Sequence, residues 1–287
     1  MQTQPFFDTG VDTRAAAKPD VLAPVNYITP GTRKPYAYEF DPPPGTPRRS
    51  ASYRDQVVRI RNAREIDWRP CIDQHSFEMR YHRSRVQDFY DEAEIRRVYY
   101  PEIQQIVKEA TGAKRVEIFD HTVRGNEQSV RGAVKIQEPA SRVHNDYTPQ
   151  SAIRRVHDIA PVEAERLLQY RVVEINVWRP ISGPLQSFPL GLIDARTIHP
   201  HDLVATDLIY RDRIGEIYYV AHNPAHEWYY YPDMTPQEVL LLKCFDNDTT
   251  RAQFGAHAAF KDPNTPPDAR ARESIEVRAF AFLAPGA

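Results

Sequence analysis

The chain has 287 residues, with 37 lysines and arginines, 39 aspartates and glutamates, and a formal net charge of -2. This balance provides no broad basic surface, so we do not expect a nucleic-acid partner. No apolar run approaches the roughly 18 residues of a membrane span, and residues 1–8 lack the pattern of a secretory signal, so no membrane association is expected. Two cysteines are too few for a disulfide framework, and we expect a cytoplasmic protein.

The first part of the chain differs in composition from the rest. Residues 1–85 are rich in proline, including residues 42–44, and have only short apolar runs such as residues 57–60. We interpret them as a proline-rich N-terminal extension that wraps the core. Residues 86–287 are expected to form the main domain, and the two parts to make one structural unit.

Two helical regions are predicted. Residues 88–110 have a helical pattern, in which Pro101 could begin a second helix after a bend. Thr148 and Pro149 have the character of an N-cap and a first-turn proline, which predicts a helix over residues 152–158. A second short helix is expected over residues 161–169.

Most other segments predict strands. The alternation is clear in residues 115–120 and weaker in residues 130–136. Further strand candidates are residues 171–178, 202–208, 216–220, 227–231, 238–244 and 275–282. Short strands at this spacing are typical of a sandwich or barrel. We therefore expect a mainly β fold with flanking helices, in the form of a double-stranded β-helix, the cupin-like jelly-roll barrel.

A His-x-Asp sequence at residues 144–146 and a distant histidine suggest an iron site. Two imidazoles and one carboxylate on one face of Fe(II) leave three positions open for a bidentate 2-oxoacid and O2. We therefore predict that His144, Asp146 and His257 bind iron and form the catalytic centre. The alternatives are that His144 and Asp146 are a loop pair capping the helix that follows, and that His257 is a hydrogen-bonded core residue.

Arg272 and Ser274 stand where a chelating 2-oxoacid would need a second anchor. They open the alternating run of residues 275–282, and residues two apart on a strand point the same way. An arginine and a hydroxyl there could bind the far carboxylate of the oxoacid. Residues 261–268 form a proline-rich loop, which we expect to be a hairpin loop that brings His257 and Arg272 onto neighbouring strands.

A substrate pocket is harder to predict. Asn176 and Trp178 share one strand face, where Asn176 could bond the oxoacid or a metal-bound water, or could satisfy buried backbone while Trp178 fills core. Arg179, on the other face, could orient a loop or bind a substrate carboxylate. The aromatic residues that could line an apolar pocket, or simply fill core, are Tyr147, Trp178, Trp228, Tyr229 and Tyr230.

Other catalytic designs are poorly represented. His222 and His226 have the spacing of a helical metal site, but Pro224 between them would disrupt that helix. The two cysteines lack the paired spacing of a zinc site. The sequence contains no nucleophile elbow, phosphate-binding loop or dinucleotide fingerprint.

Several separated motifs point to one family. They are residues 176–180, 243–246, 254–260 and 272–278. Together they resemble the AsaB-like or CmcJ-like group, which includes the fungal gibberellin desaturase and the cephamycin methoxylation oxidoreductase and is grouped with Fe(II)/2-oxoglutarate oxygenases. The resemblance covers about residues 90–285. It implies that His144, Asp146 and His257 hold iron, and that Arg272 and Ser274 hold 2-oxoglutarate.

The resemblance implies a dioxygenase that uses Fe(II), 2-oxoglutarate and O2. We expect it to act on a small natural product in secondary metabolism, by hydroxylation, desaturation or oxidative cyclisation. One alternative is an iron oxidase resembling isopenicillin N synthase, in which the Arg-x-Ser pair binds the substrate and no oxoacid is consumed. Another is a non-catalytic β-barrel that binds a small molecule. The expected partner is a small-molecule substrate, and a homodimer is left open.

Overall fold

The computed structural model describes residues 18–125, 129–131 and 134–285, which form two β-sheets. The strands of the first sheet are β1 (Val21–Ile28), β2 (Tyr36–Tyr38), β3 (Tyr53–Asn62), β8 (His144–Asn145), β10 (Leu190–Ile193), β11 (Leu203–Ile209), β12 (Ile214–Val220), β13 (Trp228–Tyr230) and β15 (His257–Ala259). Those of the second are β4 (Phe77–Tyr81), β5 (Arg115–Gly125), β6 (Ser129–Arg131), β7 (Val134–Gln137), β9 (Val172–Pro180), β14 (Glu238–Asp246) and β16 (Glu273–Phe282).

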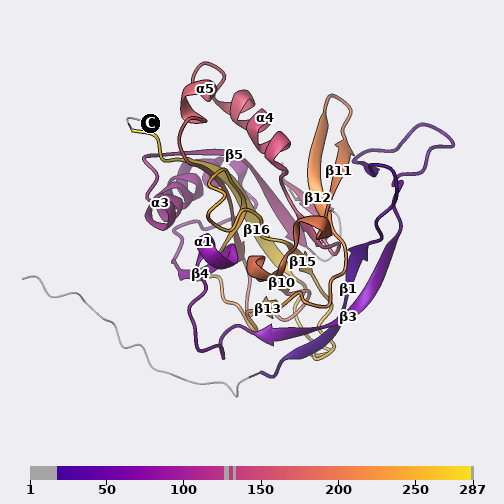
Figure 1. Cartoon of the computed structure of the whole chain (residues 1–287). Helices are drawn as coiled ribbons and strands as arrows, with labels where there is room; N and C mark the ends of the chain where they lie inside the picture. Colours follow the sequence, from indigo (N-terminus) through magenta and orange to yellow (C-terminus); the bar gives the residue numbers. More distant parts are fainter. Residues whose placement is uncertain (1–17, 126–128, 132–133, 286–287) are drawn as a thin grey trace, which may run out of the picture.

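The two sheets together form one barrel (Figure 1). The first contains the run β13-β10-β15-β8 and the second the run β14-β9-β16-β5, and the neighbours within each run are antiparallel. Along the chain these strands pass repeatedly from one sheet to the other. This is the double-stranded β-helix, so the prediction of a jelly-roll barrel is confirmed.

Alternation along the strands builds a core on each side of the second sheet. All nine residues of β9 are buried. Trp178 packs inside the barrel with Leu192 of the first sheet, whereas Ile175 and Val177 face outward. A sheet buried on both faces needs a cover on its outer face.

Helix α3 (Tyr100–Thr111) supplies that cover. It lies against β5, β9 and β16, with Ile103 and Val107 in the outer core (Figure 1). A short helix, α2 (Glu92–Glu94), and a π-helical turn, Ile95–Tyr99, lead directly into it. The predicted helical region is confirmed, but the expected bend at Pro101 is a π-helical turn.

The N-terminal part of the described chain extends both sheets. Strand β3 pairs in parallel with β13, and β4 pairs antiparallel with β14. Strand β2 pairs with β11 at the far edge of the first sheet. A short helix, α1 (Ile72–His75), lies between β3 and β4 in the sequence. The division at residue 85 between an extension and a barrel stays a prediction.

A helix and a hairpin stand beside the barrel near its predicted iron site. Helix α4 (Pro149–Ile159) begins as predicted, because the Thr148 side chain accepts a hydrogen bond from the Ser151 backbone N–H and Pro149 occupies the first turn. Helix α5 (Ala164–Leu167) is shorter than expected. The β11–β12 hairpin rises next to α4 (Figure 1).

Two short 3-10 helices, Ala195–Thr197 and Pro200–Asp202, precede the β11–β12 hairpin. None of the described helices is long and apolar enough to cross a membrane.

The expectation that His257 and Arg272 lie on neighbouring strands is wrong. His257 opens β15 in the first sheet, whereas Arg272 immediately precedes β16 in the second. In this topology the connection between the two strands crosses from one sheet to the other, so residues 260–272 form a crossover and not a hairpin. Both residues still belong to the barrel, but they approach its interior from opposite walls.

Candidate metal centre

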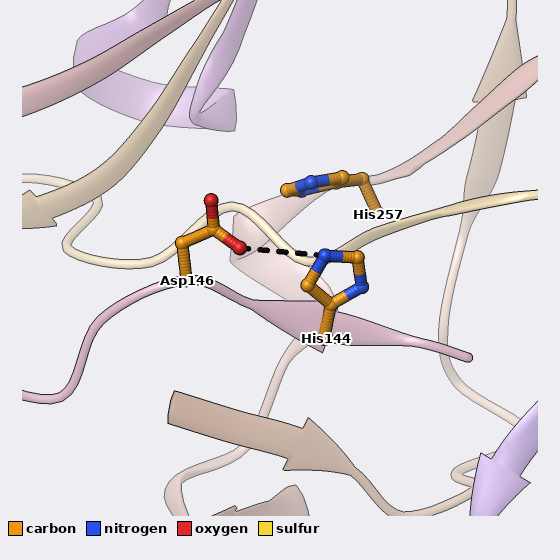
Figure 2. A group of neighbouring side chains, drawn as sticks. All are labelled: His144, Asp146 and His257. Carbon is orange, nitrogen blue, oxygen red and sulfur yellow. Dashed lines mark ion pairs between the residues drawn. The ribbon is translucent and has the colours of Figure 1, made fainter. Parts of the chain in front are cut away.

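His144, Asp146 and His257 come together at one end of the barrel. His144 opens β8, Asp146 follows that strand directly, and His257 opens β15 and pairs with His144 in register. The ligand atoms of the three side chains lie within 4.8 Å of one another. The two imidazole centroids are 4.5 Å apart, and Figure 2 shows the carboxylate beside both rings. Two nitrogens and one oxygen therefore converge on one point.

Asn145 fixes the loop between the two ligands of the His-x-Asp sequence. Its buried side-chain amide donates to the carbonyl oxygens of Tyr147 (2.7 Å) and Cys244 (2.8 Å) and accepts from the Gly255 backbone N–H at 2.9 Å. At Gly255 an added Cβ would lie 2.9 Å from the Lys243 carbonyl oxygen, so only glycine fits this close approach. Asn145 thus joins the segment that bears His144 to the segment that leads to His257.

Backbone carbonyls set the orientation of both imidazoles. Nδ1 of His144 lies 2.7 Å from the Arg142 carbonyl oxygen, and Nδ1 of His257 lies 3.0 Å from that of Gly255. Because a carbonyl oxygen only accepts, each Nδ1 carries the proton and each Nε2 keeps a free lone pair. Burial and the adjacent His144 lower the pKa of His257 to about 4, so this ring is neutral at physiological pH.

Two donors hold the Asp146 carboxylate. Its Oδ2 accepts from Asn176 Nδ2 and from Arg278 Nε, each at 2.8 Å. Its Oδ1 is left facing His144 Nε2 at 3.4 Å, the contact drawn in Figure 2. Burial alone would raise the pKa of Asp146, but the positive charge of Arg278 outweighs it, and the pKa lies well below its ordinary value. The carboxylate is therefore ionised and oriented.

The donor set fits a divalent transition metal. Two Nε2 lone pairs and one carboxylate oxygen on a single face are the set that non-haem Fe(II) oxygenases use. Outer contacts that fix the tautomer and the carboxylate are also typical of metal ligands. Among the residues that the structure describes, no other group of three or more histidines, cysteines or acidic residues is close enough to share a metal.

Arg278 is a functional candidate that the sequence analysis missed. It donates to Glu276 Oε2 at 2.5 Å, to Thr122 Oγ1 at 3.0 Å and to Asp120 Oδ1 at 3.2 Å, in addition to Asp146. It therefore links the predicted iron ligand to β5 and β16. The available signal was a pair of charged residues, Glu276 and Arg278, on the inward face of an otherwise apolar strand.

Arg272 and Ser274 lie on the same face of the chain. Arg272 Nε donates to Ser274 Oγ at 3.1 Å, and Nη1 donates to the Phe188 carbonyl oxygen at 2.8 Å. The guanidinium carbon lies 5.1 Å from the centroid of the Trp178 ring. Burial and the nearby positive charge of Arg124 lower the pKa of Arg272 to about 9. A buried guanidinium with another positive charge nearby is an environment that favours an anion.

Asn176 contacts the predicted ligand Asp146 from the inward face of β9. In addition to Asp146, its amide nitrogen donates to Glu276 Oε1 at 3.2 Å. Its oxygen Oδ1 is buried and has no hydrogen-bond partner among the described residues. A buried acceptor without a partner costs free energy unless a donor is supplied, so this oxygen is free to accept from a bound ligand or water.

A cavity of about 900 Å³ opens over the cluster. His144, Asp146 and Arg278 lie on its wall, together with residues of α4, β5, and the β11–β12 hairpin. Of the aromatic residues considered for a substrate pocket, Tyr147 lines this cavity. The cavity therefore provides access from the exterior to the face formed by the three ligand atoms.

The remaining pocket candidates lie elsewhere. Trp178 supports Arg272 inside the barrel core, and Arg179 lies on the opposite, outer face, with its Nη2 2.9 Å from His82 Nδ1. Trp228 and Tyr230 pack in a core of the first sheet, and Tyr229 packs in the barrel core. None of these five residues lines the 900 Å³ cavity. The strand alternation that turns Asn176 inward is also what turns Arg179 outward.

His222 and His226 form a separate structural cluster. The His226 ring stacks on Tyr27 at 5.8 Å, and its Nε2 lies 3.1 Å from Asp202 Oδ2. His222 packs edge-on against the same tyrosine at 5.1 Å.

Comparison with known proteins identifies the family. Residues 25–282 match the family described as an oxidoreductase/YMDC permease-like domain. The Fe(II)/2-oxoglutarate-dependent dioxygenase nvfI of Aspergillus novofumigatus is 33% identical over 266 residues, which cover 88% of this chain and 92% of that protein. This chain belongs to the Fe(II)/2-oxoglutarate-dependent dioxygenases.

Other relatives agree with this membership of the dioxygenase family. The hydroxylase/desaturase efuI of Hormonema carpetanum is 32% identical over 253 residues, covering 80% of this chain and 84% of that protein. The solved structure of the iron and alpha-ketoglutarate-dependent endoperoxidase NvfI superposes with a TM-score of 0.85 at 28% identity, covering 94% of this chain and all of that one. The predicted cofactors Fe(II), 2-oxoglutarate and O2 are thereby confirmed, and the non-catalytic and oxoacid-independent alternatives are disfavoured.

Proposed function

We propose that this dioxygenase oxidises a small natural product at an iron held by His144, Asp146 and His257. The observation that carries the proposal is the convergence of three ligand atoms within 4.8 Å beneath a cavity of about 900 Å³. Bound Fe(II), with 2-oxoglutarate and O2, supplies the oxidising chemistry that amino-acid side chains lack. The reaction we propose is hydroxylation, desaturation or oxidative cyclisation, and relatives named hydroxylase/desaturase and endoperoxidase support this range.

In this proposal the protein's task at the metal is to present ligands in fixed geometry. The Nδ1–H groups of His144 and His257 donate to backbone carbonyls and so aim each Nε2 at the shared point. Arg278 and Asn176 occupy one oxygen of Asp146 and leave the other for the metal. Ligands that are held before the metal arrives need little reorganisation when it binds.

We propose that Arg272 and Ser274 bind the distal carboxylate of 2-oxoglutarate. Arg272 is 2% exposed, and a charged hydrogen bond is strongest where water is excluded. The Trp178 ring and the Phe188 carbonyl fix the plane of its guanidinium, so the arginine is oriented in advance. The Oδ1 of Asn176, whose amide nitrogen contacts Asp146, is buried without a partner and would accept a hydrogen bond from the bound oxoacid or a water.

An anaerobic ultraviolet-visible titration tests both assignments. Fe(II) followed by 2-oxoglutarate should give the weak visible charge-transfer band of a chelated oxoacid. His257→Ala should abolish the band. Arg272→Ala should raise the 2-oxoglutarate concentration at the midpoint of the titration by about tenfold or more, because a charged hydrogen bond to the oxoacid is lost.

Matched controls are available for each variant. His201→Ala removes a histidine whose side chain is 75% exposed, and Arg270→Ala removes an arginine whose side chain is 68% exposed. Both should behave like the unmodified protein. Full iron uptake by His257→Ala would contradict the ligand assignment. Iron binding without the band would favour an oxidase that uses no oxoacid.

A further inference from the structure

Two arginines lie on the wall of the cavity that contains the predicted iron ligands. Arg142 precedes His144 by two residues in extended chain, and both line the cavity. Arg49, from the segment between β2 and β3, lines the same cavity. Neither residue is one of the three predicted iron ligands, and neither belongs to the predicted 2-oxoglutarate anchor formed by Arg272 and Ser274.

The two guanidiniums have no anionic partner among the described residues. The Nε of Arg49 and the Nε of Arg142 are both buried without a hydrogen-bond partner. No carboxylate in the described parts of the chain forms an ion pair with either side chain. A buried donor that is left unsatisfied costs free energy, so the cluster is more stable when an acceptor is supplied.

Aromatic residues hold the cluster in place. The guanidinium carbon of Arg142 lies 4.9 Å from the centroid of the Tyr53 ring, and Tyr53 packs edge-on against Tyr219 at 5.4 Å. The Tyr53 hydroxyl is a third buried donor without a partner. Burial raises the pKa of both phenols, so both remain protonated and able to donate.

The charges around the cavity leave a positive excess. Seven arginines line it: Arg49, Arg124, Arg142, Arg154, Arg155, Arg213 and Arg278. Six carboxylates line it: Glu39, Asp120, Glu138, Asp146, Asp158 and Glu216. The existing ion pairs are Arg278 with Asp120 and Asp146, Arg155 with Asp158, and Lys34 with Glu216. Seven arginines against six carboxylates leave one positive charge in excess, and an anionic ligand would offset it.

We propose that Arg49 and Arg142 bind an anionic head group on the substrate, such as a carboxylate. The substrate of this dioxygenase would then be a hydrophobic acid, with its skeleton lying along Leu208, Ile217 and Tyr147 toward the iron ligands. This inference rests on the proposed function and adds the substrate class to it. The same chemistry would also suit a carboxylate of 2-oxoglutarate, and the experiment separates these two sources.

A matched pair of fluorescent probes tests the head group. The probes are 8-anilinonaphthalene-1-sulfonate and N-phenyl-1-naphthylamine, which share a skeleton and differ in the anionic group. They are titrated anaerobically into protein loaded with Fe(II) and 2-oxoglutarate. Arg49→Gln and Arg142→Gln should each weaken the binding of the anionic probe about tenfold and leave that of the neutral probe within about twofold.

Controls distinguish a local effect from misfolding. Arg48→Gln removes the neighbouring arginine, whose side chain is 50% exposed and which does not line the cavity, and it should leave the binding of both probes unchanged. Arg142→Lys keeps the charge and should recover part of the affinity. The melting temperature of each variant should match that of the unmodified protein.

Three outcomes would overturn the inference. One is an equal loss of affinity for both probes, and another is no loss for the anionic probe. The third is a comparable shift in the 2-oxoglutarate midpoint of the visible band, which would assign the arginines to the cosubstrate. Failure of the proposed function is a distinct result, because the band would then be absent from the unmodified protein.

Discussion

Arg278 stabilises the negative charge of Asp146 and also limits how that carboxylate can move. Its Nε binds Asp146 Oδ2 at 2.8 Å, and its other nitrogens are bound by Glu276, Asp120 and Thr122. Three partners besides Asp146 thus hold the guanidinium of Arg278 in place. Without it, two carboxylates, the half-buried Asp146 and the buried Glu276, would lose their shared cation.

We expect Arg278→Met to weaken Fe(II) binding by about 10- to 100-fold, the usual effect of removing a group that orients a metal ligand. The measurement is an anaerobic competition titration against a chromophoric chelator. Arg270→Met, at an exposed position, is the control. An iron affinity within about twofold of the unmodified protein would show that Asp146 is held without Arg278.

Glu174 is a buried acid that is not among the predicted iron ligands. It is fully buried on β9, two residues before Asn176, and neither carboxylate oxygen has a hydrogen-bond partner among the described residues. Burial raises the pKa of Glu174 well above its ordinary value of 4.5, and the negative charge of Asp146 raises it further. The side chain is therefore a neutral acid inside the barrel.

The raised pKa of Glu174 makes stability depend on pH in a defined direction. Above pH 4.5 the unfolded chain releases this proton and the native chain keeps it, so this residue lowers the free energy of unfolding by about 1.4 kcal/mol for each pH unit up to the native pKa. Glu174→Gln should lack this decline. Urea unfolding of both proteins from about pH 5 to about pH 8 measures the difference. Parallel pH profiles would mean that Glu174 is ionised in the native state.

At the level of elements, the segment Lys243 to Asp246 fastens α1 to β14. Lys243 Nζ lies 2.8 Å from Asp246 Oδ2 and 3.1 Å from Asp73 Oδ1, and Arg171 binds Asp246 at 2.6 Å. The side chains of Lys243 and Asp246 have no exposed surface. This segment is one of the motifs that mark the family resemblance. Its Lys243 and Asp246 side chains join α1 to β14, and its Cys244 carbonyl accepts the hydrogen bond from Asn145, between the two predicted ligands of the His-x-Asp sequence.

Breaking this buried network should be costly. Lys243→Met is expected to lower the free energy of unfolding by about 3 kcal/mol, because Asp246 and Asp73 remain buried or half-buried with one cation fewer. Urea unfolding measures the loss. Arg96→Met, which removes an exposed i,i+4 pair with Glu92, should cost less than about 1 kcal/mol. Equal effects of the two variants would show that Arg171 alone compensates Asp246.

At the scale of the whole molecule, features that depend on nearby residues were predicted better than contacts between distant strands. Alternation identified most strands, and Thr148 with Pro149 identified the start of α4, because these signals act within a few residues. The His-x-Asp sequence and His257 were found from residue type and order. Their convergence depends on the pairing of β8 with β15, which no local pattern encodes.

The errors arose where side chains meet across the barrel. Nothing near Arg278 indicates that Asp146, 132 residues earlier, is its partner. The crossover from β15 to β16 was mistaken for a hairpin because a proline-rich loop has the same composition in both cases. The cavity wall was predicted from aromatic residues, whereas α4 and the β11–β12 hairpin bring arginines to it.

Because β8 and β15 meet at the metal cluster only in the folded chain, iron binding should stabilise the whole molecule. At Fe(II) concentrations about 100-fold above the dissociation constant, the free energy of unfolding should rise by about 2.7 kcal/mol. For a chain of this size the melting temperature should rise by roughly 5 °C under anaerobic conditions. Mg(II), which prefers oxygen ligands, is the control and should give little shift. Asp146→Ala should remove the shift, and a shift that persists in this variant would place the stabilising metal elsewhere in the molecule.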